Sequence, residues 1–299
     1  MTKVFINGFG RIGRTVLRAW AQGGWPDIDI VGINDIADAD LCAHLFEYDS
    51  VFGPFAGKVH LEGTTLHVNG HPIPMHQTRD LRNLALHGVD LVMECTGKAD
   101  DRDVALRPLT AGARRVLISG PSDAADATIV IGANEGDLAN QQIISNASCT
   151  TNALAPLVRL LEDTWGVRTG WMTTIHCYTG SQPTIDAPRG DMLRSRAAAM
   201  SMVPTTTSAM RLLDHVLPDL AGRIEGAAVR VPVASVSAVD LTVTLQTTVT
   251  REQVIDLLSK PNPIIGCTAK PLVSSDLRAR PESLIVSLPE TRVTAQGLL

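Results

Sequence analysis

The chain has 299 residues, enough for one large or two medium-sized domains, and its 44% hydrophobic and 19% charged residues are typical of a globular protein with a sizeable core. The net charge of −5 excludes an overall cationic field that would hold the chain on nucleic acid or on an anionic membrane. No segment has the form of a signal peptide or the length of a transmembrane helix, so we expect a cytoplasmic protein without nucleic-acid or membrane partners.

Strand and helix patterns alternate through the first half of the chain. The expected strands are Val4–Asn7, Ile28–Ile33, Val89–Glu94, Arg115–Ser119 and Ala127–Gly132. The expected helices are Arg11–Gln22, Ala39–Tyr48 and Arg102–Ala111. Residues 59–79 contain short β-like pieces broken by glycine and proline. This alternation predicts an α/β domain with a doubly wound, Rossmann-type parallel sheet.

A glycine-rich loop follows the first expected strand and opens the first expected helix. Gly8, Gly10 and Gly13 form a GxGxxG pattern, and Asp35 follows the first glycine by 27 residues. Alone, the pattern is also compatible with an ordinary glycine turn. With the strand, the helix and the acid in place, it indicates a dinucleotide site in which the helix N-terminus attracts the pyrophosphate. A carboxylate on the ribose repels a 2′-phosphate, which favours NAD over NADP.

The second half of the chain has longer β runs and fewer helices. The expected strands are Trp171–His176, Glu225–Val231 and Ser237–Leu245, and Asn152–Trp165 is a strong helical pattern. These features predict an α+β domain with a mixed or antiparallel sheet. We place the boundary between a dinucleotide-binding domain at residues 1–148 and a catalytic domain at residues 149–299.

One cysteine stands out among five scattered cysteines that form no CxxC pair, so no disulfide framework and no metal site are expected. Cys149 lies between Ser148 and Thr150-Thr151 at the start of the helical pattern, and any of these three hydroxyl residues is a candidate helix cap. The positive end of a helix dipole favours a thiolate. Cysteines are also commonly small buried hydrophobes, and the local pattern leaves both interpretations open.

Histidine and arginine residues supply further candidates. His176 ends an expected strand, but the chain has eight histidines and a lone histidine is more often structural. Arg194, Arg196 and Arg230 are compatible either with phosphate recognition or with solvated, salt-bridged side chains. Periodicity alone does not select among them.

Several motifs carry a resemblance to a known family. These are INGFGRIGR at 6–14, ASCTTN at 147–152, TTIH at 173–176, the arginine-rich stretch 194–196 and RVPVASVSAVDL at 230–241. From residue 2 to its end, the chain resembles the NAD-dependent, phosphorylating glyceraldehyde-3-phosphate dehydrogenase family. The cysteine motif and its spacing to the histidine are specific, whereas the glycine loop alone is not.

The resemblance implies a role for each matching residue. Cys149 is implied as the nucleophile and His176 as its base. The implied cofactor residues are Gly8, Gly10, Arg11, Ile12, Gly13, Asp35, Arg79, Thr96, Gly97, Ser119 and Pro188. Thr179, Arg194 and Arg230 are implied for the substrate's phosphate. Ser148, Thr150, Thr207 and Ser208 are implied for the attacking inorganic phosphate. The segment from about Tyr178 to Met200 resembles a loop that packs on a neighbouring subunit, so a homotetramer is expected.

The implied reaction is the oxidation of glyceraldehyde 3-phosphate to 1,3-bisphosphoglycerate with NAD and inorganic phosphate, through a thioester on Cys149. Alternatives on the same scaffold are an erythrose-4-phosphate dehydrogenase and an enzyme that accepts arsenate. A catalytically weak redox-sensing or binding protein is the alternative from another class.

Two departures from the family pattern bear on these alternatives. Ser208 stands where the family has a glycine in the loop of the attacking phosphate. The sequence also stops at Leu299, before the family's final strand and C-terminal helix. Without the final strand and helix, we expect an exposed apolar surface, a lower melting temperature and slow turnover in the 299-residue chain.

Overall fold

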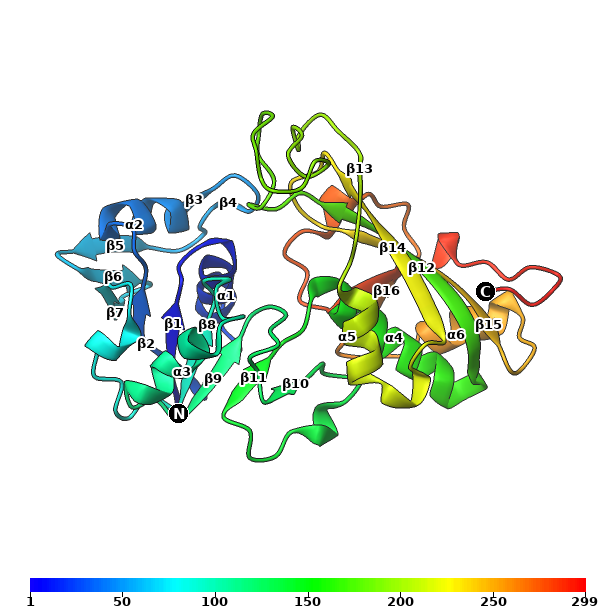
Figure 1. Ribbon diagram of the computed structural model, residues 1–299, viewed down its shortest axis with the longest axis horizontal. Helices are drawn as coiled ribbons and strands as arrows, with labels where there is room; N and C mark the ends of the chain where they lie inside the picture. Colours follow the sequence, from blue (N-terminus) through cyan, green and yellow to red (C-terminus); the bar gives the residue numbers. More distant parts are fainter. The chain divides into compact units, whose positions relative to one another are not determined.

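The computed structural model describes residues 1–299, and the chain divides into two compact units. Unit 1 contains Met1–Ile129 and Gly136–Ala147, and unit 2 contains Val130–Glu135 and Ser148–Leu299. Each unit has its own sheet and its own helices (Figure 1). None of the helices combines the length and the apolar character that a membrane span requires.

Unit 1 is built on a sheet with the strand order β10-β11-β9-β8-β1-β2-β7-β6-β5. Its strands are β1 (Thr2–Asn7), β2 (Ile28–Asn34), β5 (Val59–Glu62), β6 (Thr65–Val68), β7 (His71–His76), β8 (Leu91–Glu94), β9 (Arg115–Ile118), β10 (Ala127–Thr128) and β11 (Ile143–Ser145). Its helices are α1 (Arg11–Ala21), α2 (Ala39–Glu47) and α3 (Arg102–Thr110), and the short pair β3 (Tyr48–Asp49) and β4 (Gly53–Pro54) lies apart from the main sheet. From β10 to β7 the pairs are parallel, whereas β5, β6 and β7 pair antiparallel.

The core of unit 1 lies on both faces of this sheet. Alternate residues of a strand point to opposite faces. Val4 and Ile6 of β1 therefore pack with Leu17 of α1 and Phe46 of α2, while Phe5 lies in a second core on the other face. The predicted doubly wound parallel sheet is confirmed.

Unit 2 contains a four-stranded sheet in the order β13-β14-β12-β15. Its elements are β12 (Val167–Cys177), β13 (Val203–Thr205), β14 (Ile224–Val231), β15 (Ala238–Leu245), β16 (Ile265–Thr268), β17 (Leu284–Ser287), α4 (Cys149–Trp165), α5 (Ala209–Val216) and α6 (Arg251–Leu258). Strand β12 pairs in parallel with β14 and antiparallel with β15, so the predicted mixed sheet is confirmed. Five short 3-10 turns complete the chain: Leu81–Asn83, Glu135–Asp137, Pro218–Leu220, Ser274–Leu277 and Leu288–Glu290.

Several element boundaries differ from the expected ones, and two of these differences have a clear local reason. Helix α4 begins at Cys149 rather than at Asn152, because the Ser148 side chain accepts the Thr151 N–H at 3.0 Å and caps the helix there. The strand expected at Ala127–Gly132 ends at Thr128. Beyond it, Val130 O accepts the N–H groups of two following residues at 3.1 Å each and forms a turn.

Candidate active site and cofactor site

The predicted cofactor residues of unit 1 lie at the carboxyl ends of its parallel strands. The glycine loop joins β1 to α1, Asp35 follows β2, Arg79 lies beyond β7, Thr96 and Gly97 lie beyond β8, and Ser119 follows β9. Ligands of sheets of this type bind at this edge. The structure therefore brings together the candidates that unit 1 contributes.

Each of the three glycines of the loop is suited to its position for a different structural reason. Gly8 has a φ of +91°, and a Cβ there would lie 2.7 Å from the Thr96 nitrogen. A Cβ on Gly13 would lie 2.2 Å from Gly8 O. Gly10 is the N-cap of α1, and a Cβ there would meet nothing within 4 Å. Gly8 and Gly13 thus allow the tight turn, and Gly10 leaves open space before the first N–H groups of α1, a position suited to an anion.

The Asp35 carboxylate is held by the backbone around it. Oδ2 accepts the Phe9 N–H at 2.6 Å, and Oδ1 accepts the Ala37 N–H at 2.9 Å. The first bond ties the acid to the glycine loop. Arg11 and Ile12 are exposed in the first turn of α1, close in sequence to the same loop.

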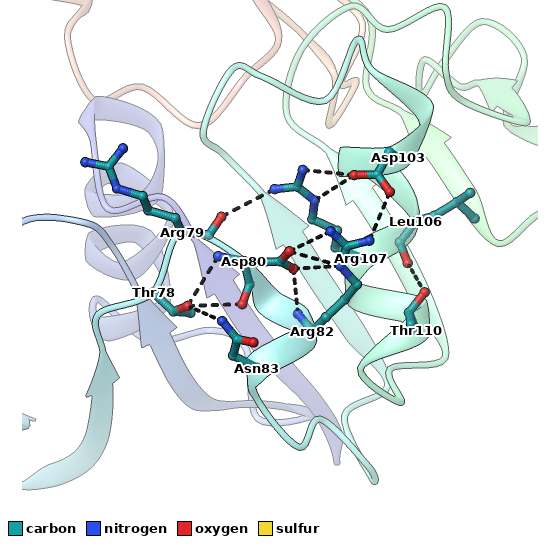
Figure 2. A network of polar contacts seen from close by, with 9 residues as sticks. All are labelled: Thr78, Arg79, Asp80, Arg82, Asn83, Asp103, Leu106, Arg107 and Thr110. Atoms are coloured by element: carbon teal, nitrogen blue, oxygen red, sulfur yellow. Dashed lines mark hydrogen bonds and ion pairs between the residues drawn. The ribbon is translucent and has the colours of Figure 1, made fainter.

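The segment that carries Arg79 is fixed by an ion network (Figure 2). Arg82 bonds to Asp80 and to Asp103 of α3, and Arg107 also bonds to Asp103. Arg107 donates to the carbonyl of Arg79 at 3.4 Å, whereas the Arg79 side chain extends away from the network. The guanidinium of Arg79 is exposed and available to a ligand.

In unit 2, Cys149 and His176 form a close pair. Cys149 is the first residue of α4, and its Sγ lies 3.2 Å from His176 Nε2 of β12. Cys149 as a whole residue is exposed, although its sulfur is partly buried. Ala147, just before the cap, is buried and has a φ of +54°, a left-handed conformation that is strained for alanine.

The two groups shift each other's protonation in opposite directions. Partial burial of the sulfur would raise the pKa of Cys149, but the hydrogen bond and positive charge of His176, aided by Thr150, outweigh it and lower that pKa. The hydrogen bond to Cys149, with contacts to Cys177, raises the pKa of His176 to about 10. These opposite shifts favour the thiolate form of Cys149 and the imidazolium form of His176.

The other imidazole nitrogen is held by a carbonyl. His176 Nδ1 lies 2.6 Å from Cys177 O, and Arg230 Nη1 donates to the same oxygen at 2.9 Å. Arginine has no acceptor, so the 3.1 Å approach of Arg230 Nη1 to Nδ1 is not a hydrogen bond between them when Nδ1 carries its proton. Nδ1–H donates to the carbonyl, and Nε2 faces the sulfur.

Arg230 belongs to a group that suits an anion. It pairs in register with His176, and its Nη1 lies 3.5 Å from Thr179 Oγ1. Burial, and then the positive charge of Arg194, lower the pKa of Arg230. Arg194 is itself oriented by Thr205 Oγ1 at 2.8 Å and by the Thr206 carbonyl. Two guanidinium groups close enough to influence each other electrostatically favour a bound phosphate.

The remaining candidates of unit 2 lie on two helix starts and one long loop. Ser148 and Thr150 are in the first turn of α4, where Thr150 Oγ1 lies 3.5 Å from Thr174 Oγ1. Thr207 Oγ1 accepts the Ala209 N–H at 3.1 Å, and Ser208 is the N-cap of α5. Pro188 and Arg196 are exposed between β12 and β13. Arg196 forms an ion pair with Asp186 at 2.8 Å. Of the two interpretations of Arg196, phosphate recognition and a salt-bridged side chain, this contact fits the second.

Three buried polar residues at the sheet edge of unit 1 were not among the predicted site residues. Asn7, Asn34 and Glu94 are the last residues of β1, β2 and β8, and they are hydrogen-bonded to one another in a row. The available signal was a polar residue that closes each of three apolar strands.

Comparisons with known proteins match both halves of the chain to one family. Residues 2–102 match the family model described as glyceraldehyde 3-phosphate dehydrogenase, NAD binding domain. Residues 148–299 match the model described as glyceraldehyde 3-phosphate dehydrogenase, C-terminal domain.

Individual relatives agree with the family models. The chain is 45% identical over 299 residues to the glyceraldehyde-3-phosphate dehydrogenase of Xanthobacter flavus, an alignment that covers 97% of this chain and 89% of the relative. It is 43% identical over 300 residues to glyceraldehyde-3-phosphate dehydrogenase 1 of Bacillus subtilis strain 168, with the same coverage of 97% and 89%. The chain is 43% identical over 309 residues to the glyceraldehyde-3-phosphate dehydrogenase of Kitasatospora aureofaciens, with coverage of 100% of this chain and 92% of the relative.

Proposed function

The chain belongs to the glyceraldehyde-3-phosphate dehydrogenase family, and from this premise we propose that it oxidises glyceraldehyde 3-phosphate to 1,3-bisphosphoglycerate with NAD and inorganic phosphate. It is an NAD-dependent oxidoreductase. The observation that carries the proposal is the 3.2 Å pair of Cys149 Sγ and His176 Nε2, next to the guanidinium of Arg230.

The carboxyl edge of unit 1 fits NAD. The open space at Gly10 suits a pyrophosphate at the start of α1, and the oriented carboxylate of Asp35 suits the two hydroxyls of an adenosine ribose. We assign NAD binding to residues 1–148, with Arg79, Thr96, Gly97 and Ser119 at the same edge, and catalysis to residues 149–299. When bound, NAD accepts a hydride from the substrate.

The first chemical step belongs to Cys149 and His176. The thiolate attacks the aldehyde carbon and forms a carbon–sulfur bond, and His176 Nε2–H gives its proton to the oxygen that becomes negative. The backbone N–H of Cys149, at the start of α4, adds stabilisation to that oxygen. His176 then takes the hydroxyl proton back as the hydride leaves, and a thioester on Cys149 remains.

The second step resolves the thioester. A phosphate oxygen attacks the acyl carbon, the carbon–sulfur bond breaks, and the thiolate returns beside the imidazolium. Thr179, Arg194 and Arg230 hold the substrate's own phosphate in this proposal. Ser148, Thr150, Thr207 and Ser208 hold the attacking phosphate, because hydroxyl groups and helix starts are suited to anions.

The test is the formation of NADH by the wild-type chain and by two cysteine variants. Wild type should show NADH formation that requires glyceraldehyde 3-phosphate and phosphate. Cys149→Ser should lose NADH formation and still bind NAD, because a serine hydroxyl ionises far less readily than a thiol. Cys267→Ser, which removes a cysteine of β16, should keep the activity. Near-normal turnover by Cys149→Ser would refute the mechanism.

We also propose a homotetramer in the cytoplasm. Met172 and Thr174 of β12 are buried, whereas Trp171 and Ile175 on the opposite face of the strand are 50% and 42% exposed. Two large exposed apolar side chains on one sheet face fit contact with a second copy of the chain. All five cysteines are free, which suits the reducing compartment that a reactive thiolate requires.

A further inference from the structure

A row of buried polar side chains crosses the carboxyl edge of the unit 1 sheet. Asn34, Asn7 and Glu94 end the adjacent strands β2, β1 and β8, and their exposed fractions are 4%, 7% and 1%. Glutamate is rarely buried to this extent unless hydrogen bonds satisfy its oxygens. The mechanism described above assigns no role to this carboxylate.

The backbone of Thr78 sets the direction of the row at one end. Asn34 Oδ1 accepts the Thr78 N–H at 2.9 Å, and Asn34 Nδ2 donates to Thr78 O at 3.0 Å. Backbone donors and acceptors cannot exchange roles, so the Asn34 amide has one orientation. Its Nδ2 also donates to Asn7 Oδ1 at 2.8 Å, and Asn7 Nδ2 therefore donates to Glu94 Oε2.

The other end of the row is also fixed by a backbone group. The Thr96 N–H donates to Glu94 Oε1 at 2.9 Å, and the Thr96 hydroxyl donates to the same oxygen. Both oxygens of Glu94 must therefore accept hydrogen bonds. The isosteric amide of glutamine has only one acceptor oxygen, so it cannot accept at both positions.

We propose that Glu94 is a positioning residue for the NAD site. It is the hydrogen-bond acceptor that aligns the loops following β2, β7 and β8. Asp35 directly follows Asn34, Arg79 directly follows Thr78, and Gly97 directly follows Thr96. Glu94 thereby links the ribose carboxylate, the exposed guanidinium of Figure 2 and the turn beyond β8. The inference rests on the NAD site of the proposed function.

Glu94→Gln is the isosteric variant that breaks this pattern. If its new NH₂ group faces Thr96, the Thr96 N–H loses its acceptor. If the NH₂ group faces Asn7, the Asn7 and Asn34 amides must turn over, and Asn34 then opposes the Thr78 backbone with donor against donor and acceptor against acceptor. Either outcome displaces a loop at the proposed NAD site, because an unsatisfied buried donor is costly.

The experiment measures the dissociation constant for NAD by calorimetry, together with kcat and KM for NAD. Glu94→Gln should bind NAD about tenfold more weakly and raise KM to match, with kcat at saturating NAD within about twofold of wild type. The matched control is Asp90→Asn at the opposite end of β8, where the carboxylate accepts the Lys3 N–H at 2.9 Å. The control should lower the melting temperature and leave the NAD affinity within about twofold.

A double variant tests the direction of the row. In Asn7→Asp/Glu94→Gln, the new carboxylate at position 7 accepts from Asn34 and from the new amide at position 94, whose oxygen accepts both Thr96 donors. Every bond is restored and the charge is kept, so NAD affinity should return to within about threefold of wild type. The double variant should also fold if Glu94→Gln alone does not.

Each outcome separates this inference from the proposed function. A wild-type chain that does not bind NAD would refute the proposed cofactor site itself. Wild-type affinity in Glu94→Gln, an equal loss in Asp90→Asn, or a double variant that fails to fold or to recover affinity would overturn the positioning role of Glu94.

Discussion

At the scale of single residues, the reactivity of Cys149 depends on one neighbour. His176 supplies the hydrogen bond and the charge that lower the thiol pKa, while partial burial works in the opposite direction. In His176→Asn only the weaker contribution of Thr150 opposes the effect of burial, so the thiol pKa should rise. Alkylation of Cys149 by iodoacetamide near neutral pH should slow by about tenfold or more, and its pH profile should move to higher pH.

The control for this experiment is His215→Asn, which removes a histidine from the last turn of α5. Its alkylation profile should match that of wild type. An unchanged profile in His176→Asn would show that the helix start alone activates the thiol.

Asp35 provides a second prediction at this scale. Because its oxygens accept the Phe9 and Ala37 N–H groups, truncation would remove both acceptors, whereas Asp35→Asn removes the charge and keeps one of the two. Without that charge the 2′-phosphate of NADP is no longer repelled. The ratio of kcat/KM for NAD over NADP should fall by about tenfold or more.

The exposed Asp38 at the start of α2 offers a matched control. Asp38→Asn should leave the cofactor ratio unchanged. A wild-type chain that prefers NADP would contradict the assignment of Asp35.

At the scale of secondary-structure elements, the start of α4 contributes both to the stability of the fold and to the proposed phosphate site. Ser148 caps this helix, so Ser148→Ala should lower the free energy of unfolding by about 1 kcal/mol. It should also raise KM for inorganic phosphate, because the hydroxyl is proposed to contact that substrate. Thr250→Ala removes the capping box of α6 and should cost a similar amount of stability without changing this KM. Thermal denaturation and steady-state kinetics of both variants give the comparison.

The start of α4 also shows which features could be predicted from the sequence and which could not. Alternating strands and helices predicted the doubly wound sheet, because each pattern reflects a local period in the chain. The first turn of α4 was missed, because Cys149 and the two threonines after it have no apolar period, and three hydroxyl residues competed as caps. The Glu94 row was missed because its partners come from strands distant in sequence, and only the pairing of β2, β1 and β8 brings them together.

At the scale of the whole molecule, the exposed face of β12 predicts assembly. Trp171→Lys places a charge on this face opposite Glu225 of β14, where the single chain can accommodate it. Burying that charge between copies is costly, so light scattering should report a smaller assembly than for wild type. Trp25→Ser removes an exposed tryptophan from unit 1 and should leave the mass unchanged. An unchanged mass in Trp171→Lys would exclude this face as the interface.

The shared carbonyl of Cys177 has a consequence for the order of events in time. Since Nδ1–H of His176 is committed to that oxygen, which Arg230 also bonds, the ring cannot pass a proton from one nitrogen to the other. The proton given to the substrate oxygen and the proton taken back from it both cross at Nε2. The imidazolium is therefore regenerated before phosphate releases the thiolate, and the enzyme begins its next cycle as an ion pair without drawing a proton from solvent.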